Sequence, residues 1–186
     1  MAKGANHIFD SSLIPLFGCE QLDLVVYPCE QLYQANKEFV IEQTLKVLTP
    51  NVVKSLPPHF HDIETTFAAD SWLLSRFQEC QLLAIVDQDK RQLIGFIFVY
   101  MSEESARAKS QHLGYLLAEA CWGKGFATQI LSSYIAYCKQ IEFTGVIHAG
   151  VESDNIGSIK ILEKCGFMLS NQQKVAEGNL FYQLSL

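Results

Sequence analysis

A glycine-rich turn between a predicted strand and a predicted helix is the segment best suited to binding an anion. Residues 113–130 read LGYLLAEACWGKGFATQI, with Gly123 and Gly125 just before an amphipathic helix. The first N–H groups of a helix have no partner within the helix, the helix dipole adds partial positive charge there, and glycine has no Cβ to obstruct an anion. The turn therefore predicts a phosphate site over residues 122–128.

The spacing of this turn argues against the two common nucleotide motifs. It lacks the GxxxxGK[ST] of a Walker A loop, and Thr128 stands where a Rossmann GxGxxG turn has its third glycine. No acidic ribose ligand follows on a strand end about 20 residues later. Taken alone, the turn also fits a tight bend that binds nothing, and this alternative stays open.

A second segment adds to the pattern. Residues 150–167 read GVESDNIGSIKILEKCGF, and together with the turn they resemble the GNAT superfamily of N-acetyltransferases, which use acetyl-coenzyme A. The phosphate turn of that family has the form [QR]xxGx[GA], and Trp122 stands here at the Gln or Arg position. The matching residues are Gly125 and Ala127 in the turn and Asn155, Ser158, Glu163, Lys164, Gly166 and Phe167 in the later motif.

Within that superfamily the sequence is most similar to the RimJ/RimL-type branch of ribosomal-protein N-terminal acetyltransferases. That branch often has GYxL before the turn and Trp-Gly-Lys-Gly within it, as residues 114–117 and 122–125 have here. The resemblance covers residues 20–186, and its motifs are strongest over residues 111–167. It implies acetyl-CoA as cosubstrate, no metal, and a primary amine as acceptor, either a protein N-terminus or a small amine.

The resemblance also assigns cofactor-binding residues. Acetyl-CoA would enter a gap between two splayed parallel strands, expected at Gln111–Ala118 and Gly145–Val151, with Gly114 as a bulge residue. Lys124 also fits a solvated turn lysine, and Asn155 also fits a helix N-cap. The expected contacts are Leu116, Leu117 and Ala118 for the pantetheine, Trp122, Gly123, Lys124, Gly125, Phe126, Ala127 and Thr128 in the phosphate turn, and Asn155 and Ser158 beside the pantetheine.

Direct acetyl transfer needs a base for the ammonium, donors for the oxyanion and an acid for the sulfur. Many relatives place a Tyr acid where this sequence has Leu162, so Ser158 is the expected acid or hydrogen-bond donor. Ser158 also fits a small helix residue that packs beside the cofactor. Glu152 is the expected base and His112 the second choice, although each also fits a structural role. Asp154 or a relayed water are further alternatives.

Two other groups have residue types that could do chemistry. His59 and His61 form an HxH pair in a proline-rich loop, but no third metal ligand follows at a fixed spacing, so a plain loop is favoured. Cys121 abuts the turn and would suit a ping-pong nucleophile. No His-Asp pair lies near it in sequence, so a buried thiol is favoured.

The elements that must position these residues follow from apolar periodicity. The pattern predicts an α/β (α+β) fold with a mixed sheet. The resemblance implies that this sheet is mostly antiparallel, with one splayed parallel strand pair and helices on both faces. Residues 1–19 are expected to be an N-terminal extension and residues 20–186 a single domain. The predicted strands are 22–27, 82–86, 93–101, 112–117, 145–151, 167–169 and 180–184, and the helices 31–48, 61–80, 128–141 and 155–165.

Composition narrows the class of protein further. The 186 residues are 49% hydrophobic and carry a formal net charge of −6, which argues against disorder and against a nucleic-acid partner. The longest apolar run is too short to span a membrane, and six scattered cysteines suit a reducing cytoplasm. We therefore expect a cytoplasmic acetyltransferase, monomeric or homodimeric. The alternative is a catalytically degenerate GNAT-fold protein that binds CoA or a partner.

Overall fold

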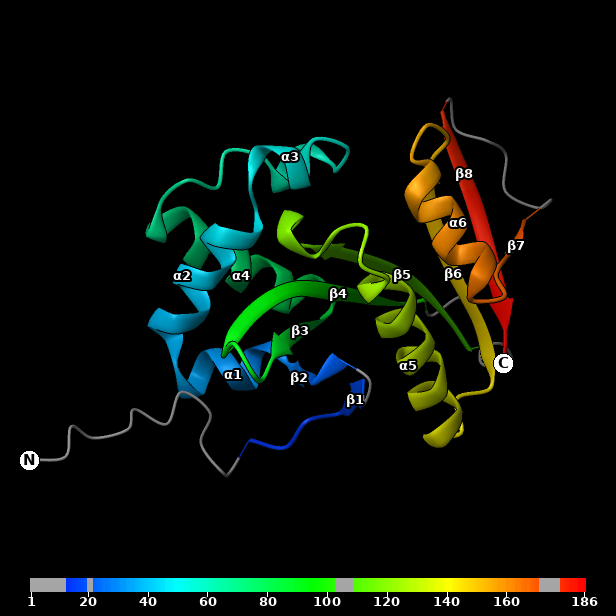
Figure 1. Cartoon of the computed structure of the whole chain (residues 1–186), viewed down its shortest axis with the longest axis horizontal. Helices are drawn as coiled ribbons and strands as arrows, with labels where there is room; N and C mark the ends of the chain where they lie inside the picture. Colours follow the sequence, from blue (N-terminus) through cyan, green and yellow to red (C-terminus); the bar gives the residue numbers. More distant parts are fainter. Residues whose placement is uncertain (1–12, 20–21, 103–108, 171–177) are drawn as a thin grey trace, which may run out of the picture.

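The computed structural model describes residues 13–19, 22–102, 109–170 and 178–186, whose strands form one eight-stranded sheet (Figure 1). The strand order is β1-β2-β3-β4-β5-β6-β8-β7, and among these strands only β5 and β6 pair in parallel. This confirms the predicted mixed, mostly antiparallel sheet. The strands are β1 (Phe17–Cys19), β2 (Leu24–Pro28), β3 (Gln81–Asp87), β4 (Gln92–Ser102), β5 (Lys109–Leu117), β6 (Gly145–Glu152), β7 (Met168–Leu169) and β8 (Asn179–Ser185).

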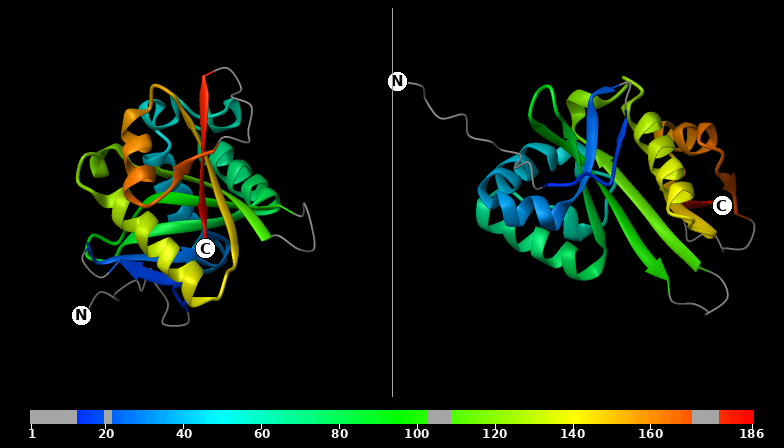
Figure 2. Two further views of the ribbon diagram at one scale, coloured as in Figure 1. Left: turned by 90° about the vertical axis from the view of Figure 1, so that its right-hand side faces the viewer. Right: turned by 90° about the horizontal axis from the view of Figure 1, so that it is seen from below.

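Helices cover both faces of the sheet, as predicted (Figure 2). Side chains alternate across a strand, so neighbouring residues of β4 enter different cores: Phe96 packs in one with α1, α2 and α4, and Ile97 in the other with α5 and α6. Within the described residues, none of the helices is long and apolar enough to cross a membrane. The helices are α1 (Cys29–Ala35), α2 (Lys37–Val47), α3 (Pro50–Val53), α4 (Thr66–Glu79), α5 (Phe126–Gln140) and α6 (Ile156–Lys164), with short 3₁₀ turns η2 (Pro58–Phe60) and η3 (Glu119–Cys121).

The predicted helix over residues 31–48 is in fact two helices followed by a third. Asn36 separates α1 from α2 and caps α2, because its side chain accepts a hydrogen bond from the Phe39 N–H at 3.1 Å. Thr49 caps α3 in the same way, and Pro50 occupies the first turn of that helix, where a missing N–H costs nothing. α3 forms one wall of a cavity beside the end of β5.

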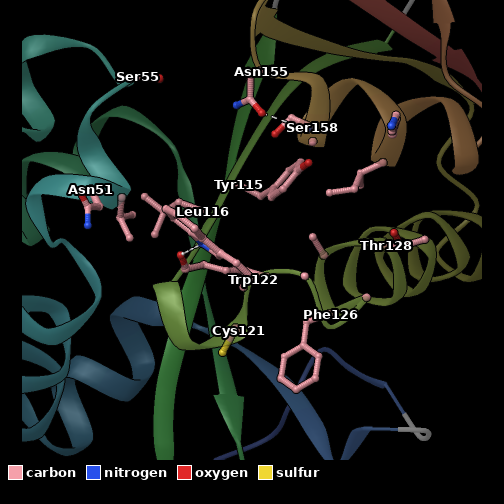
Figure 3. A pocket seen from close by; sticks show the side chains of 18 of the residues that line it. Asn51, Ser55, Tyr115, Leu116, Cys121, Trp122, Phe126, Thr128, Asn155 and Ser158 are labelled. Carbon is pink, nitrogen blue, oxygen red and sulfur yellow. Dashed lines mark hydrogen bonds between the residues drawn. The ribbon is translucent and has the colours of Figure 1, made fainter.

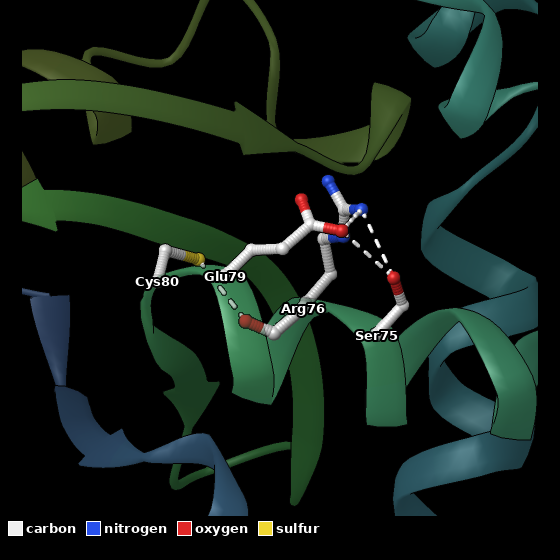
Figure 4. Close-up of polar contacts among 4 residues, drawn as sticks. All are labelled: Ser75, Arg76, Glu79 and Cys80. Carbon is white, nitrogen blue, oxygen red and sulfur yellow. Dashed lines mark hydrogen bonds and ion pairs between the residues drawn. The ribbon is translucent and has the colours of Figure 1, made fainter.

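α4 begins at Thr66 rather than at the predicted residue 61, because the Thr65 side chain caps it by accepting from the Ala68 N–H at 3.1 Å. The helix carries a buried cation, Arg76, which is 4% exposed. Its Nη2 donates to Glu79 at 2.6 Å (Figure 4). Its guanidinium also lies 5.8 Å from the centre of the Phe60 ring. This arrangement ties α4 to the loop before it.

β1 lies inside the segment expected to be an N-terminal extension. Phe17–Cys19 pairs antiparallel with β2, and the Leu16 N–H donates to the Val26 carbonyl at 2.8 Å. The ring of Phe17 also stacks on Tyr137 of α5, with 5.2 Å between the ring centres. The expected boundary between extension and domain, after residue 19, therefore comes directly after β1, a strand that belongs to the sheet.

β5 and β6 form a fork. Their parallel pairing runs from Lys109 opposite Gly145 to His112 opposite His148, after which both strands continue without pairing to each other. The expected bulge at Gly114 is wrong, because the register between β4 and β5 runs without a shift from Ser110 to Leu117. The divergence arises instead because β5 stays paired with β4 while β6 stays paired with β8.

Candidate functional site

A cavity of about 690 Å³ opens at the fork (Figure 3). β5 and the turn behind it form its floor, the first turns of α5 and α6 form one side, and α3 with the loop behind it forms the other. Ala118, Lys124, His112 and Glu152 do not line this cavity. The expected residues that do line it are Leu116, Leu117, Trp122, Gly123, Gly125, Phe126, Ala127, Thr128, Asn155 and Ser158.

The phosphate turn has the backbone geometry that its glycines suggested. Gly123 and Gly125 adopt φ values of +70° and +79°, in the left-handed region that side chains with a Cβ disfavour. Gly125 is the N-cap of α5 and offers no side chain to the helix. The N–H groups of the first turn of α5 are thus left for a ligand in the cavity that they border.

Trp122 holds the turn against the end of β5. Its indole Nε1–H donates to the Leu117 carbonyl at 2.8 Å, while the side chain remains 50% exposed at the cavity. This bond fixes the distance between the strand and the glycines, a role that sequence reasoning did not assign to the tryptophan. Trp122 therefore has a structural function of its own where similar sequences have Gln or Arg.

The free edge of β5 faces the fork through alternate residues. The Ala118 N–H donates to the Ile94 carbonyl of β4 at 2.8 Å, and an antiparallel ladder alternates its hydrogen bonds along the strand. Leu116 shares the orientation of Ala118 toward β4, so the main chains of Tyr115 and Leu117 face the gap. Of the three backbone contacts expected from the sequence, Leu117 thus faces the fork, and Tyr115 is one that the sequence reasoning missed.

Asn155 begins α6 and positions the residues that follow. Its side-chain oxygen accepts from the Ser158 N–H at 3.0 Å, which is the N-cap that the sequence allowed (Figure 3). Asn155 and Ser158 both line the cavity, so the cap does not withdraw them from it. Leu162, one turn further on, is 2% exposed and packs in the core.

Tyr115, which was not among the expected site residues, lines the cavity together with Asn155 and Ser158. Its Oη is buried and makes no hydrogen bond of ordinary geometry with any described residue. Figure 3 shows the Tyr115 hydroxyl on the side of its ring toward Ser158; burial raises the pKa of this hydroxyl, and the Ser158 hydroxyl acts in the opposite direction. The sequence contained the residue within GYLL but no signal for the face of the strand on which it lies.

The two expected bases lie outside the cavity and apart from each other. His112 is exposed and stacks on His148 at the start of the fork, with 5.1 Å between ring centres. Glu152 ends β6, opposite Asn179 of β8. It lies four residues beyond His148, roughly 13 Å along an extended strand. The structure therefore does not bring the two candidates together.

The α3 wall is tied to the site by Glu119 of η3. Its carboxylate accepts from the Thr49 hydroxyl and from the Asn51 Nδ2 at 2.9 Å. These two hydrogen bonds, first from Thr49 and then from Asn51, lower the pKa of Glu119. Asn51 and Ser55 then face the cavity from a part of the sequence more than 60 residues from the turn (Figure 3).

The remaining candidates offer less chemistry. Burial raises the pKa of the Cys121 thiol, although Lys124 lowers it, so this cavity-lining thiol is protonated near neutral pH and a poor nucleophile. His61 Nε2 lies 2.9 Å from the Val53 carbonyl. Across the described ranges, no group of three His, Cys, Asp or Glu residues is arranged to hold a metal.

A forked mixed sheet with a glycine turn at its open end defines a class of fold in which a phosphorylated cofactor binds between two strands. A family model for the acetyltransferase (GNAT) domain matches residues 41–168. The chain belongs to the GNAT acetyltransferase family.

Similar proteins agree with this assignment. The chain is 31% identical over 119 residues to the uncharacterized N-acetyltransferase p20 of Bacillus licheniformis, covering 61% of this chain and 65% of that protein, under two thirds of its length. One similar solved structure is the microcin C7 self-immunity acetyltransferase MccE in complex with acetyl-CoA and AMP. It superimposes with a TM-score of 0.69 at 16% identity, and the match covers 95% of this chain and 100% of that one. A putative ribosomal-protein-serine acetyltransferase of Vibrio cholerae gives 0.61 at 13% identity, covering 88% and 94%. At these identities the two structures support the fold alone.

Proposed function

We propose that this protein transfers an acetyl group directly from acetyl-CoA to a primary amine. The observation that carries the proposal is the continuity of one cavity, which joins the anion-binding turn at the N-terminus of α5 to the free edge of β5. A ligand with a phosphate at one end and an extended amide chain at the other has the shape and the hydrogen-bonding groups for both parts.

The described residues fit such a ligand in their chemistry. The first-turn N–H groups of α5 suit a pyrophosphate, and Lys160 and Lys164 line the same cavity with positive charge. The outward-facing main chain of Tyr115 and Leu117 suits the amides of the pantetheine, although the Leu117 carbonyl already accepts from Trp122. Asn155 has a side-chain amide at the same wall. Residues 20–186 form the proposed catalytic domain.

In the reaction, the neutral amine attacks the thioester carbonyl and the CoA thiolate leaves. Glu152 remains our proposed base and His112 the second choice, acting through water because neither lines the cavity. Ser158, which lines the cavity from α6, is our proposed hydrogen-bond donor to the reacting end of the pantetheine. The α3 wall, with Asn51 and Ser55, is the surface that we assign to the acceptor.

The acceptor class is a further part of the proposal. The GYLL and WGKG segments favour the RimJ/RimL-type branch and hence a peptide N-terminus, with small amines as the alternative. All six cysteines are free thiols, which fits a reducing cytoplasm.

A second candidate function is the binding of CoA or of a partner protein without catalysis. The specific observation in its favour is Leu162, an apolar and buried residue where related sequences often have a tyrosine acid. The absence of both expected bases from the cavity lining adds to it.

Calorimetry and thiol release separate these functions. Acetyl-CoA, CoA, ATP and NAD are titrated separately into the protein, and CoA release is then followed with a panel of peptides with free N-termini, amino acids, polyamines and aminoglycosides. We expect acetyl-CoA to bind and at least one amine class to accelerate release. Binding without release from any amine supports the second function, and tight binding of ATP or NAD in place of acetyl-CoA overturns both.

A further inference from the structure

We propose that the Tyr115 hydroxyl, assisted by Ser158, donates the proton that the CoA sulfur takes up when the acetyl group leaves. The proposal rests on the proposed function and names a residue for one of its steps. It places the acid on β5, at the floor of the cavity, rather than on α6.

The position of Tyr115 is the first observation. The main chain of this residue faces the fork, where the pantetheine is expected, and its side chain packs on the α5 and α6 side of the sheet and lines the cavity. Figure 3 shows the ring of Tyr115 pointing from β5 toward Ser158 in the first turn of α6.

The unpartnered hydroxyl is the second observation. Buried polar atoms are almost always hydrogen-bonded, and one without a partner costs free energy unless something else satisfies it. The Oη of Tyr115 has no partner among the described residues, and it belongs to a residue of the cavity wall. The hydroxyl thus lies buried at the end of a ring that lines the cavity, with hydrogen-bonding capacity left for a ligand atom that reaches it.

The protonation state is consistent with a donor. Burial raises the pKa of Tyr115, so the phenol keeps its proton at neutral pH, while the adjacent Ser158 hydroxyl stabilises the phenolate and limits that rise. Asn155 fixes the backbone of Ser158 through its cap at 3.0 Å. Serine alone is a much weaker acid than a phenol, so Ser158 is a positioning residue for Tyr115 in this arrangement.

Other cavity groups suit this step less well. Leu162 has no proton to give, and Thr128 lies in the phosphate turn. Cys121 is on the 3₁₀ turn behind β5, next to the glycines and not at α6. Among the hydroxyl groups that line the cavity, Tyr115 is therefore the most acidic one that lies beside the first turn of α6.

The step balances without any further reagent. The amine nitrogen forms the C–N bond, the C–S bond breaks with its electron pair on sulfur, and sulfur takes the proton from Tyr115 Oη. The amine nitrogen loses its proton through water to the proposed base, Glu152, and that proton then returns through water to the phenolate, with Ser158 as the neighbouring hydroxyl. The products are the amide, CoA thiol and the original phenol.

The test uses bound CoA, so it does not depend on knowing the acceptor. The ultraviolet absorbance of the thiolate is followed against pH for CoA bound to the wild type, Tyr115→Phe, Ser158→Ala and Tyr137→Phe. Tyr137 is a matched control because it belongs to the same core but lines no part of the cavity. A hydrogen bond to the charged thiolate favours that form, so we expect it to appear at a pH about one unit lower in the wild type than in Tyr115→Phe.

Steady-state kinetics and thermal unfolding then distinguish a catalytic acid from a structural residue. Tyr115→Phe should lower kcat with little change in KM for acetyl-CoA, Ser158→Ala should have a smaller effect in the same direction, and Tyr137→Phe should have none. Tyr115→Phe should keep the wild-type Tm or exceed it, because it removes an unpartnered buried hydroxyl.

An unchanged thiolate midpoint in Tyr115→Phe, or equal weakening of its binding to CoA and to desulfo-CoA, would overturn the proposal. If the phenylalanine variant does not fold, Ser158→Ala decides, since it must shift the midpoint in the same direction. Failure of the wild type to bind CoA at all would overturn the proposed function instead.

Discussion

His112 and His148 face each other on the last paired rung of β5 and β6, and their rings stack with 5.1 Å between centres and 26° between planes. The fork opens immediately beyond this pair. The two imidazoles therefore lie at the closed end of the fork. The glycine turn lies at its open end.

This geometry separates base candidates from cofactor-binding residues. Because His112 and Glu152 do not line the cavity, His112→Gln and Glu152→Gln should each leave the acetyl-CoA Kd within about twofold of the wild type. Calorimetry measures this, and the pH dependence of kcat with an accepted amine then shows which variant loses a titrating base. A tenfold weaker Kd in either variant would contradict the arrangement at the fork.

The left-handed glycine at the start of α5 should matter for both folding and binding. Gly125→Ala forces a Cβ into φ +79°, at a cost of about 1–2 kcal/mol in the free energy of unfolding. Gly178→Ala is the matched control, since its φ is +92°, a Cβ there also meets nothing within 4 Å, and it does not line the cavity. Denaturant unfolding should show similar losses, and calorimetry should show weaker acetyl-CoA binding in Gly125→Ala alone.

The indole bond of Trp122 gives an optical prediction. Acetyl-CoA should change the tryptophan emission of the wild type, because Trp122 is half exposed in the cavity whereas Trp72, the second of two tryptophans, is buried elsewhere. Trp122→Phe should abolish that change and, having lost the 2.8 Å bond to Leu117, bind acetyl-CoA about two- to tenfold more weakly. A residual change carried by Trp72 would mean that binding alters the distant core.

The two roles of Asn155 can be separated by substitution. Asn155→Ala removes the cap on Ser158 and should lower the free energy of unfolding by about 1 kcal/mol, whereas Asn155→Ser retains a capping hydroxyl and should not. Both variants lose the side-chain amide, so both should weaken acetyl-CoA binding by calorimetry. Wild-type affinity in Asn155→Ser would show that the cap is the whole role of the residue.

Glu119 should make the α3 wall sensitive to acid. A carboxyl whose pKa is lower in the folded protein stabilises the fold above its unfolded value of 4.5, and this contribution is lost as the pH falls through the folded pKa. The Tm of the wild type should therefore exceed that of Glu119→Gln near neutral pH, and the difference should shrink as the pH falls below 4.5 and disappear below the folded pKa. A difference that persists in acid would show that the charge is not its source.

Much of the site could be predicted because its residues are adjacent in sequence. The turn from Trp122 to Thr128 and the cap at Asn155 each form within one short segment, so spacing alone specified them. The central strand β4 was equally clear, since seven consecutive residues, 93–99, are buried on both faces.

The parts that were missed depend on tertiary contacts or weak local signals. The free hydroxyl of Tyr115 follows from which face of β5 its side chain takes, and the bond of Glu119 to α3 joins residues about 70 apart in sequence. β1 has only three residues, too few for a periodic pattern. The break at Asn36 was signalled by a capping residue, but apolar periodicity outweighed that signal in the prediction. α3 has only four residues, again too few for a periodic pattern.

The fork gives the sheet an additional edge in its interior. Beyond His112, β5 has main-chain groups without a strand beside them on the β6 side, and an unpaired edge is ordinarily a template for association with another chain. Here that edge lies at the bottom of a cavity with α3 on one side and α6 on the other, so a second polypeptide strand cannot lie flat against it. The molecule can thus keep a sheet edge permanently open for a slender ligand while remaining protected from edge-to-edge aggregation.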